Sequence, residues 1–581
     1  MGKKSDVTRR DFLLGTGAVV AGAAALGLAG CTDNTKTEEP PPAPPVEPDP
    51  PKSEWDYEAD IIVCGTGPAG LCCAATAAEA GCSVIMIEAA KWIGGKGIQA
   101  GGNFGVGGGT RMQIEGGFLE SEAIIIQDRR ENTLRDDGRT MTIELVDGRR
   151  HTMPQWRKVS GCDDWEGNAE AFARESLPCW NWLDKMGAKF IRANVSPYAN
   201  VYRGSRAFTT TTASPVDRPA WKEGDWVAGG AGIYWPVFDT AIANGAELML
   251  ETKMVKIIRD GGRREGRVIG VEAELLAEGD KVIKLKGNKA VFIGTGSWNA
   301  NPVLKKFLAP YLKDYPHFSG EPLIYNDGKG VEELFEIGAA MSTDRGNDWH
   351  GWHRHPGTVW HSVSPPFGSR GTAEIDDTNC IYVNADGRRF MNEEIGEDNP
   401  AWLPGCKPFY FAQIAGEQKT DKDGPIVWIV CDEETRNAQN LNFSVGPDGA
   451  YGSMCTTGMA FRGDTIEAAA SAAGLNSGNV AAAVKRYNEL VEADKDTDFE
   501  KRDLGRTIST PPFHIVKWGI QKHNTLGGAA IDEKARILDW QGKPIPGLYG
   551  AGEATGGMDL IGIAKPTVFG RIAGLVIPKE E

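Results

Sequence analysis

Three glycines and one acid form the first pattern in the sequence that suits a specific chemistry. Gly65, Gly67 and Gly70 stand in a G-x-G-x-x-G spacing, and Glu88 ends the next apolar segment. Glycine lets the backbone turn tightly and approach a pyrophosphate, and the N-terminus of a following helix offers N–H groups and a positive dipole end. A carboxylate after the second strand accepts hydrogen bonds from a ribose 2′-hydroxyl. The pattern predicts dinucleotide binding, with Ala69 of the same turn included among the binding residues.

The elements that must position this turn are readable on either side of it. Residues 61–63 read as an apolar strand, an alanine-rich helix runs to about Gly81, and residues 83–87 read as a second strand. The glycine spacing alone is a weak signal, but strand, turn, helix, strand and acid follow one another in the order of a dinucleotide-binding unit. The sequence therefore predicts an α/β fold that begins with this unit.

The glycine-rich loop at residues 91–110, KWIGGKGIQAGGNFGVGGGT, favours FAD over NAD. Backbone this rich in glycine can pack flat against a large ring system, although a purely structural loop is the alternative. The residues of the loop that we expect at the cofactor are Gly95, Lys96, Gly97, Gly101 and Gly102.

Two further cofactor-like segments lie far downstream. Residues 289–301 read as a strand followed by a glycine turn that contains Thr295 and Gly296. Residues 547–557 read as a strand followed by Gly-x-Gly-Glu, which places Gly552 and the carboxylate of Glu553 at a ribityl chain.

A helix is predicted to begin near Gly562 and Ile563. Its N-terminus would face N1 and O2 of a flavin, and its dipole would stabilise the reduced, anionic ring.

These ordered segments resemble the FAD-dependent fumarate reductase and succinate dehydrogenase flavoprotein superfamily, in particular its soluble, secreted fumarate reductase-like and 3-ketosteroid dehydrogenase-like members. The resemblance covers about residues 57–581 and implies a Rossmann-like FAD-binding domain split in sequence by an α+β capping domain. It places the first part of the FAD-binding domain at 55–340, the cap at 341–520 and the second part at 521–581. It also places Met254 near the adenine. Further segments that carry the likeness are 228–260, 381–394, 484–501, 511–518 and 523–532.

The resemblance also indicates the chemistry, which is hydride transfer between flavin N5 and a C=C or CH–CH unit, with a proton moved by a cap residue. Fumarate reductases carry an arginine eight residues after the arginine of the motif RFMNE. That motif begins here at Arg389, which we include among the candidate catalytic residues, and the later position holds Glu397. Glu397 is a candidate proton donor if burial raises its pKa, and a solvated loop acid is the alternative.

The groups with which fumarate reductases bind a dicarboxylate are incomplete. His523 is followed by Asn524 where those enzymes have a second histidine, and residues 558–566, MDLIGIAKP, lack their arginine. A dianion left unpaired in such a site costs several kcal/mol, so we do not expect fumarate to be the substrate.

Four of the eight histidines and three tryptophans crowd into residues 348–361. His355 resembles the family's substrate-binding histidine, and aromatic walls with few cations suit a larger, mostly neutral enone, such as a steroid-like, lactone-bearing or phenylpropenoid compound. A packed turn or a metal site are the alternatives, and we predict no metal.

Residues 1–31 resemble a twin-arginine export signal, with Arg9 and Arg10 before an apolar run that ends in a lipoprotein-like LAGC at Cys31. Residues 32–54 are proline-rich and acidic and predict an extended linker. We expect an extracytoplasmic protein tethered to a membrane through lipidated Cys31, and a permanent membrane helix is the alternative.

The composition restricts the partners. A net charge of −16 argues against nucleic acid. The 11 cysteines form no CxxC, which excludes c-type haem attachment and the usual clustered iron–sulfur spacings. Electrons are therefore expected from an external electron-transfer protein or a quinol-linked cytochrome. Cys64, Cys72, Cys73 and Cys82 are expected to be buried free thiols.

We thus expect an exported oxidoreductase with non-covalent FAD, since residues 88–110 lack the histidine of the family's covalent link. It would reduce an activated C=C bond of a small unsaturated organic substrate. The alternatives are a ketosteroid-type dehydrogenase working oxidatively and a non-catalytic binding lipoprotein. Residues 115–165 are expected to be an insertion with a hairpin.

Overall fold

The computed structural model describes part of the chain, beginning at residue 54. The described residues are 54–100, 104–105, 110–111, 134–144, 150–158, 167–188, 190–192, 207–210, 230–298, 301–308, 326–342, 357–362, 379–393, 418–421, 424–438, 460–517, 519–525, 528–556 and 563–580. The predicted export signal, Cys31 and nearly all of the predicted linker lie outside them. Within these ranges, no helix has the length and apolar character needed to cross a membrane.

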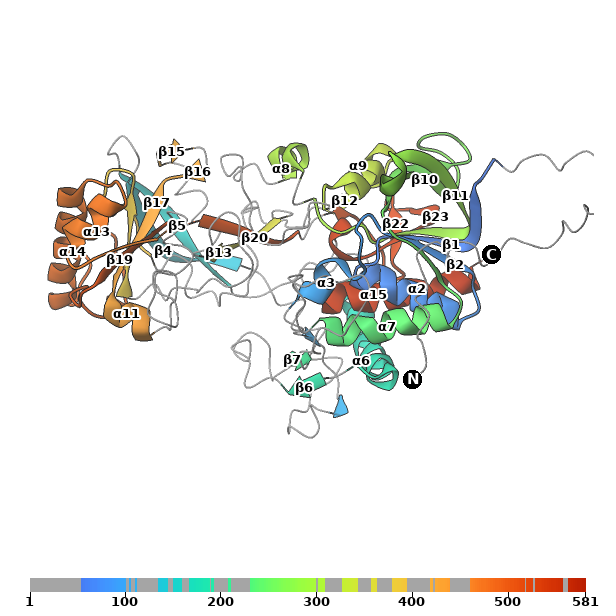
Figure 1. Ribbon diagram of the computed structural model, residues 1–581, viewed down its shortest axis with the longest axis horizontal. Coiled ribbons are helices and arrows are strands. Elements are labelled where there is room, and N and C mark those ends of the chain that lie inside the picture. The colour runs from blue at the N-terminus through green and yellow to red at the C-terminus, as the bar shows by residue number, and fades with distance from the viewer. Residues whose placement is uncertain are drawn as a thin grey trace, which may run out of the picture. The chain divides into compact units, whose positions relative to one another are not determined.

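The largest of the described sheets has eight strands, and Figure 1 shows it on the right. Its path runs β22-β23-β11-β1-β2-β8, in which the five strands from β23 to β8 are parallel to one another, whereas β22 is antiparallel to β23. Strands from both ends of the chain therefore share one sheet, which confirms the predicted α/β fold. Their bounds are β1 (Tyr57–Cys64), β2 (Val84–Ile87), β8 (Glu247–Met249), β11 (Lys281–Ile293), β22 (Arg536–Leu538) and β23 (Pro544–Gly550).

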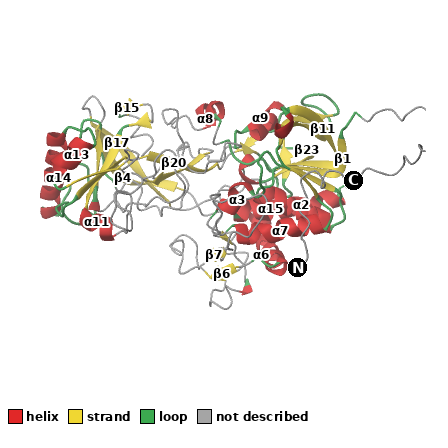
Figure 2. Ribbon diagram, viewed as in Figure 1, coloured by secondary structure: helices red, strands yellow, loops and turns green. Residues whose placement is uncertain are grey.

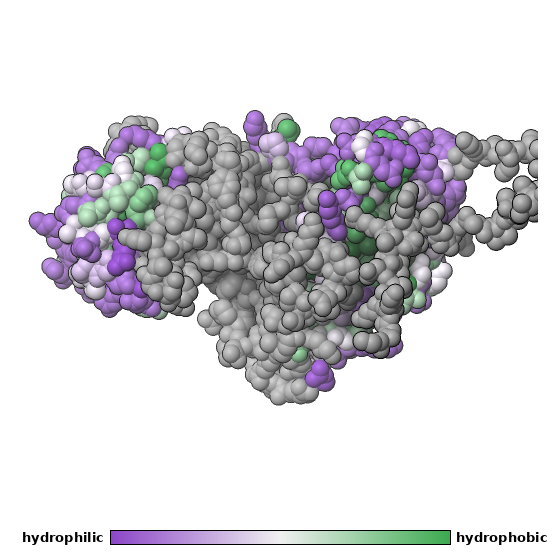
Figure 3. Space-filling model, viewed as in Figure 1, coloured by the Kyte–Doolittle hydropathy of each residue, from purple (hydrophilic) through white to green (hydrophobic). Residues whose placement is uncertain are grey.

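The central strands are apolar on both faces, as parallel strands covered on two sides must be. Residues 61–64 of β1 and 290–293 of β11 are fully buried. The first half of β11 also pairs with β10 (Val268–Leu275), which pairs in turn with β9 (Thr252–Arg259), and both pairings are antiparallel. On the face shown in Figure 3, hydrophilic side chains cover the region of β10 and of α9 (Lys329–Glu336).

Four helices gather along one side of this sheet (Figures 1 and 2). They are α2 (Pro68–Glu79), α6 (Asn168–Met186), α7 (Ala231–Ala243) and α15 (Ala564–Val576).

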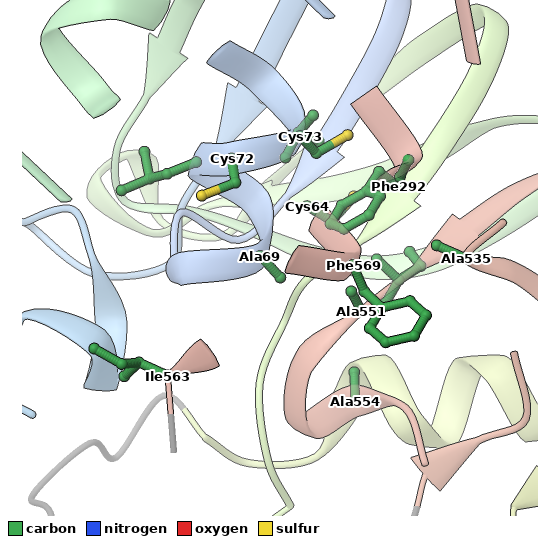
Figure 4. Packing of buried hydrophobic residues seen from close by; sticks show 14 of the residues in the cluster. Cys64, Ala69, Cys72, Cys73, Phe292, Ala535, Ala551, Ala554, Ile563 and Phe569 are labelled. Carbon is green, nitrogen blue, oxygen red and sulfur yellow. The ribbon is translucent and has the colours of Figure 1, made fainter. Parts of the chain in front are cut away.

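Small residues let α2 and α15 approach closely, as Figure 4 shows around Ala69, Cys73 and Phe569. A Cβ atom at Gly570 would lie 2.2 Å from the carbonyl oxygen of Ala69, and one at Gly574 would lie 2.7 Å from that of Cys73. Since real Cβ atoms do not come this near, glycine is needed at both positions.

A second, antiparallel sheet has the order β14-β17-β19-β18. It packs with α14, whose buried residues Val480, Val484 and Tyr487 recur at helical spacing. These elements fall within the predicted cap, whose boundaries stay a prediction. Their bounds are β14 (Ile381–Asn384), β17 (Val427–Asp432), α11 (Glu433–Ala438), β18 (Ala460–Gly463), α13 (Ile466–Ala472), α14 (Ser477–Glu492) and β19 (Phe513–Lys517).

The remaining elements are short pairs and helices. The antiparallel pair β4 (Leu134–Glu144) and β5 (Arg150–Lys158) confirms the hairpin predicted within 115–165. The others are α3 (Gly95–Gln99), β3 (Phe104–Gly105), β6 (Phe190–Arg192), β7 (Ala207–Thr210), η2 (Leu276–Glu278), α8 (Pro302–Leu308), β12 (Met341–Ser342), β13 (Gly357–Ser362), β15 (Thr420–Asp421), β16 (Gly424–Pro425), β20 (Gly519–Thr525), β21 (Gly528–Ala529), η5 (Gly552–Ala554) and η6 (Ile577–Lys579).

The cysteines of the described residues are buried and free, which confirms the prediction for Cys64, Cys72, Cys73 and Cys82. Burial also raises the pKa of the Cys179 thiol on α6 to about 12. These thiols stay protonated at neutral pH and pack as small apolar groups.

Candidate functional site

Predicted site residues follow four parallel strands at the same edge of the large sheet. Gly65 follows β1, Glu88 follows β2, Thr295 lies just beyond β11, and Gly552 lies just beyond β23. Ligands of open α/β sheets bind outside the carboxyl ends of the strands, so this edge is the candidate site.

The glycine turn between β1 and α2 is built around backbone that admits no side chain. Gly65 has a φ of +95°, and a Cβ atom there would lie 2.5 Å from the carbonyl oxygen of Gly294. A Cβ atom at Gly70 would lie 1.9 Å from the carbonyl oxygen of Gly65. Among the described residues other than its chain neighbours, the nearest atom to a Cβ at Gly67 is the carbonyl oxygen of Gly294, 4.0 Å away, so these residues leave space beside the start of α2. The turn therefore suits a phosphate group at the helix N-terminus.

Glu88 is a buried carboxylate that ties the turn to the end of β2. Its Oε2 accepts hydrogen bonds from the backbone N–H of Thr66 at 2.8 Å and from the Thr66 hydroxyl at 2.7 Å. Its Oε1 accepts one from the N–H of Ala90 at 2.9 Å. A carboxylate has about four acceptor positions, so capacity remains for a ligand hydroxyl. The sequence reasoning missed Thr66, although its hydroxyl lies inside the glycine spacing and could have been paired with the acid of Glu88.

Replacing Glu88 by glutamine is expected to weaken FAD binding. Both carboxylate oxygens face N–H or O–H donors, so the amide NH₂ of glutamine would meet a donor on either side. The loss of one charge-assisted hydrogen bond, about 1.5–3 kcal/mol, corresponds to roughly ten- to hundredfold weaker binding. FAD release followed by its fluorescence measures the effect. Glu58→Gln on β1, which removes the same charge and weakens a solvent-exposed pair with Lys286, is the control, and equal loss in both variants would contradict the role of Glu88.

Lys96 and Glu553 were predicted separately and meet in the structure. The Lys96 Nζ on α3 lies 3.1 Å from each carboxylate oxygen of Glu553 on η5. Both side chains are mostly buried. Gly95 begins α3 beside the phosphate turn, since a Cβ there would lie 3.5 Å from the Gly67 Cα. A ligand at Glu553 thus lies within reach of a fixed ammonium group.

Two hydroxyl groups after β11 point to a ligand as well. The Oγ1 of Thr295 and the Oγ of Ser297 are buried, and neither has a hydrogen-bond partner among the described residues. A buried hydroxyl left unsatisfied costs about 1–3 kcal/mol, which a bound polar group would remove. Gly296, between them, has a φ of +79° and would meet the Asn326 side chain if it carried a Cβ. With the glycine turn and Glu88, these groups fit a dinucleotide such as FAD.

Two further predicted residues are buried next to these elements. Ile563 immediately precedes α15 and is 6% exposed. Met254 is 4% exposed on β9, opposite Ala273 of β10.

Arg389 lies in a buried ion network of the four-stranded unit, which is the antiparallel sheet β14-β17-β19-β18 with the helices packed on it. Its guanidinium donates to both carboxylate oxygens of Glu393, at 2.9 and 2.8 Å, and to Asp496 at 2.7 Å. It also stacks over the rings of Tyr487 and Phe499. This network gives Arg389 a structural role, and its catalytic role stays a prediction. Glu393 is the last residue of the RFMNE motif, whereas nothing in the sequence indicated Asp496, because its pairing with Arg389 is recognisable only in the folded chain.

The remaining predicted site residues lie beyond what can be described. Gly101, Gly102, His355, Glu397 and Gly562 lie outside the described residues. His523 lies on β20, where the structure describes the backbone only. Within the described ranges, no cluster of His, Cys, Asp and Glu is suited to hold a metal ion.

Comparison with known proteins agrees with this geometry. A family model described as an FAD binding domain matches residues 139–562, and one described as an FAD dependent oxidoreductase matches residues 60–149. A probable fumarate reductase of Shewanella frigidimarina is 27% identical in an alignment 529 residues long, which covers 88% of this chain and 74% of that protein. Digoxin reductase of Eggerthella lenta is 26% identical over 566 residues, 94% of this chain and 91% of that protein.

A solved structure shows the same fold. The open conformation of a flavocytochrome c3 fumarate reductase superimposes with a TM-score of 0.64 at 24% identity, over 90% of this chain and 79% of that one.

Proposed function

This chain belongs to the FAD binding domain family and to the FAD-dependent fumarate reductase and succinate dehydrogenase flavoprotein superfamily, and on that premise we propose that it reduces an activated C=C bond of a mostly neutral organic substrate. The protein is an FAD-dependent oxidoreductase. The observation that carries the proposed substrate class is the absence of a histidine and of an arginine at two positions where fumarate reductases carry them. Asn524 replaces a histidine, and residues 558–566 contain no arginine. A dicarboxylate would lose its partners there.

The described residues divide the binding of FAD among them. The turn at Gly65 and Gly67 and the N-terminus of α2 receive the pyrophosphate, and Glu88 accepts a hydrogen bond from a ribose. Lys96 and Glu553 hold the ribityl chain in the proposed arrangement. When bound, FAD supplies the hydride chemistry. We propose that it is held non-covalently, so that acid precipitation releases all of it into the supernatant.

The proton is proposed to come from Glu397. This residue is an acid at the position where fumarate reductases carry an arginine, eight residues after Arg389. Its carboxyl group must be protonated to donate, which burial beside a bound substrate would favour.

Two features support a larger neutral substrate. Residues 348–361 combine histidines that can polarise a carbonyl with tryptophans that can pack on a flat apolar molecule. A relative that spans nearly the whole chain bears the name digoxin reductase. We propose an enone or unsaturated lactone as the reacting group.

Export and electron supply complete the proposal. The twin-arginine pattern at Arg9 and Arg10 and the LAGC segment ending at Cys31 support an extracytoplasmic protein on a lipid anchor. An external electron-transfer protein or a quinol-linked cytochrome is the proposed donor, because the cysteines carry no cluster or haem spacing.

The test is an anaerobic assay of the full-length protein loaded with FAD, in which reoxidation of a reduced viologen dye reports turnover. We expect turnover with an unsaturated lactone or a 3-keto-4-ene steroid and little with fumarate or urocanate. Turnover with fumarate alone would contradict the neutral-substrate proposal. Oxidation of a saturated ketosteroid with an oxidised dye, without the reverse reaction, would establish the dehydrogenase alternative. No turnover in either direction would favour a binding protein.

Glu397→Gln is expected to lower kcat on the preferred substrate by roughly a hundred- to ten-thousandfold, the usual contribution of a general acid. Its neighbours provide matched controls, because Glu394→Gln and Asp398→Asn remove the same charge from the same short segment. Unchanged kcat in Glu397→Gln would exclude it as the proton donor.

A further inference from the structure

A chain of buried hydrogen bonds joins α7 to the first turn of α15. The hydroxyl of Tyr234 on α7 lies 2.7 Å from the Oγ1 of Thr567 on α15. The Thr567 hydroxyl donates to the carbonyl oxygen of Ile563 at 2.5 Å. Tyr234 and Thr567 are fully buried, and Ile563 belongs to the buried cluster drawn in Figure 4.

The direction of this chain follows from the number of hydrogens. Threonine has one hydroxyl hydrogen, and a carbonyl oxygen can only accept. Because Thr567 donates to Ile563, the hydrogen between the two hydroxyls comes from Tyr234, whose oxygen lies closer to the Thr567 hydroxyl, at 2.7 Å, than to the Ile563 carbonyl oxygen, at 3.4 Å. Burial raises the pKa of Tyr234 well above its usual value, so its hydroxyl stays a donor.

The carbonyl of Ile563 needs this support because its helical bond is long. The backbone N–H of Thr567 reaches it at 3.3 Å, whereas the Thr567 hydroxyl reaches it at 2.5 Å. The hydroxyl of Thr567, more than its backbone N–H, therefore fixes the orientation of the Ile563 carbonyl group.

The anchored carbonyl also sets the direction of an N–H group. The carbonyl of Ile563 and the N–H of Ala564 belong to one planar trans peptide and point in opposite directions. Ala564 is the first residue of α15, and its N–H precedes the helical hydrogen-bond ladder. Pro566, in the same turn, has no N–H. The N–H of Ala564 is therefore one of the two N–H groups, with that of Lys565, that the start of this helix offers a ligand, and its direction affects what the ligand meets.

We propose that Tyr234 and Thr567 are positioning residues, which aim the Ala564 N–H at the bound FAD and thereby stabilise the negative charge of the reduced cofactor. The inference rests on the proposed placement of the flavin ring at the N-terminus of α15. It is independent of the organic substrate.

The test compares the redox potential of bound FAD in the wild type and in Tyr234→Phe, by anaerobic equilibration with a reference dye and without organic substrate. Tyr234→Phe removes one hydroxyl and keeps the buried ring. We expect reduced FAD to lose affinity relative to oxidised FAD by about three- to tenfold, which lowers the potential by about 15–30 mV for a two-electron couple.

Variants of Thr567 test the direction of the chain. Thr567→Val removes the donor to Ile563 and should lower the potential at least as far, whereas Thr567→Ser keeps the hydroxyl and should restore it. Combining Tyr234→Phe with Thr567→Val should add little, because both act through one carbonyl.

The control is Tyr487→Phe, which removes a comparable buried hydrogen bond, from the Tyr487 hydroxyl to the carbonyl oxygen of Leu504, in the four-stranded unit. It should lower the melting temperature and leave the potential unchanged. An unchanged potential in Tyr234→Phe, with a loss of stability like that of Tyr487→Phe, would overturn the inference. That result would leave the proposed C=C reduction intact, since the latter is tested by turnover.

Discussion

Replacing Gly70 by alanine is expected to yield protein that retains little or no FAD. The new Cβ atom would lie 1.9 Å from the carbonyl oxygen of Gly65, so the phosphate turn must move. Gly65 is itself held, since its N–H donates to Ile87 at 2.8 Å. Overpacking of this kind costs about 1–3 kcal/mol. If this free energy is lost from the FAD-bound state, the affinity for FAD falls roughly ten- to hundredfold. The flavin-to-protein ratio after gel filtration measures it.

The loss expected in Gly70→Ala is opposite in sign to the usual effect of replacing a helical glycine by alanine. Alanine normally stabilises a helix relative to glycine by about 0.5–1 kcal/mol. Gly478 on α14 is the matched control, because among the described residues a Cβ there would meet the Asn476 side chain alone, at 3.5 Å. Gly478→Ala should unfold at the same temperature or higher and keep its FAD. Full FAD content in Gly70→Ala would show that the turn accommodates a side chain.

Replacing Arg389 by methionine is expected to destabilise the four-stranded unit by about 3–5 kcal/mol, the usual result of removing one partner of a buried ion pair. Glu393 and Asp496 have fully buried side chains and would lose their bonds to the guanidinium. Lys501, whose ammonium lies 3.5 Å from Glu393, compensates only in part. Urea unfolding followed by tryptophan fluorescence measures the loss. The control is Arg486→Met, which breaks an exposed pair with Asp498 and should leave the unfolding curve nearly unchanged.

The loss of stability expected in Arg389→Met should depend on pH. Burial opposes the ionisation of Asp496, but the charge and hydrogen bond of Arg389 and nearby backbone N–H groups offset it and hold the pKa of Asp496 below its usual value. In the wild type, this contribution is present above the unfolded pKa of about 4 and is lost as the pH falls through the lower folded pKa. Without Arg389, burial would raise the pKa of Asp496 in the folded variant. Protonation of Asp496 in acid would then remove the unpaired buried charge and reduce the destabilisation of the variant. The difference between the two proteins should therefore be largest at neutral pH and narrow in acid. A constant difference would contradict this account.

The sequence predicted the structure most completely where the backbone conformation restricts which residue types can occur. The segment from 60 to 88 predicted β1, the glycine turn, α2, β2 and Glu88, because few sequences other than closely spaced glycines permit such a turn against a helix. Alternation of polar and apolar residues likewise predicted the β4–β5 hairpin. The resemblance implied that residues 521–581 return to the FAD-binding domain, but the pairing of β23 with β11 was not predicted, since a parallel neighbour hundreds of residues away leaves no periodic signal.

The sequence by itself determined that a dinucleotide turn with an acidic partner follows β1, since tight backbone contacts restrict those positions to glycine. Only the tertiary structure decided which side chains meet at the site. Lys96 pairs with Glu553 across 457 residues, Tyr234 supports Thr567 across 333, and Arg389 is enclosed by Asp496 from 107 residues away. Each pair depends on two elements brought together by burial of apolar surface elsewhere, so neither partner's immediate sequence specifies the other.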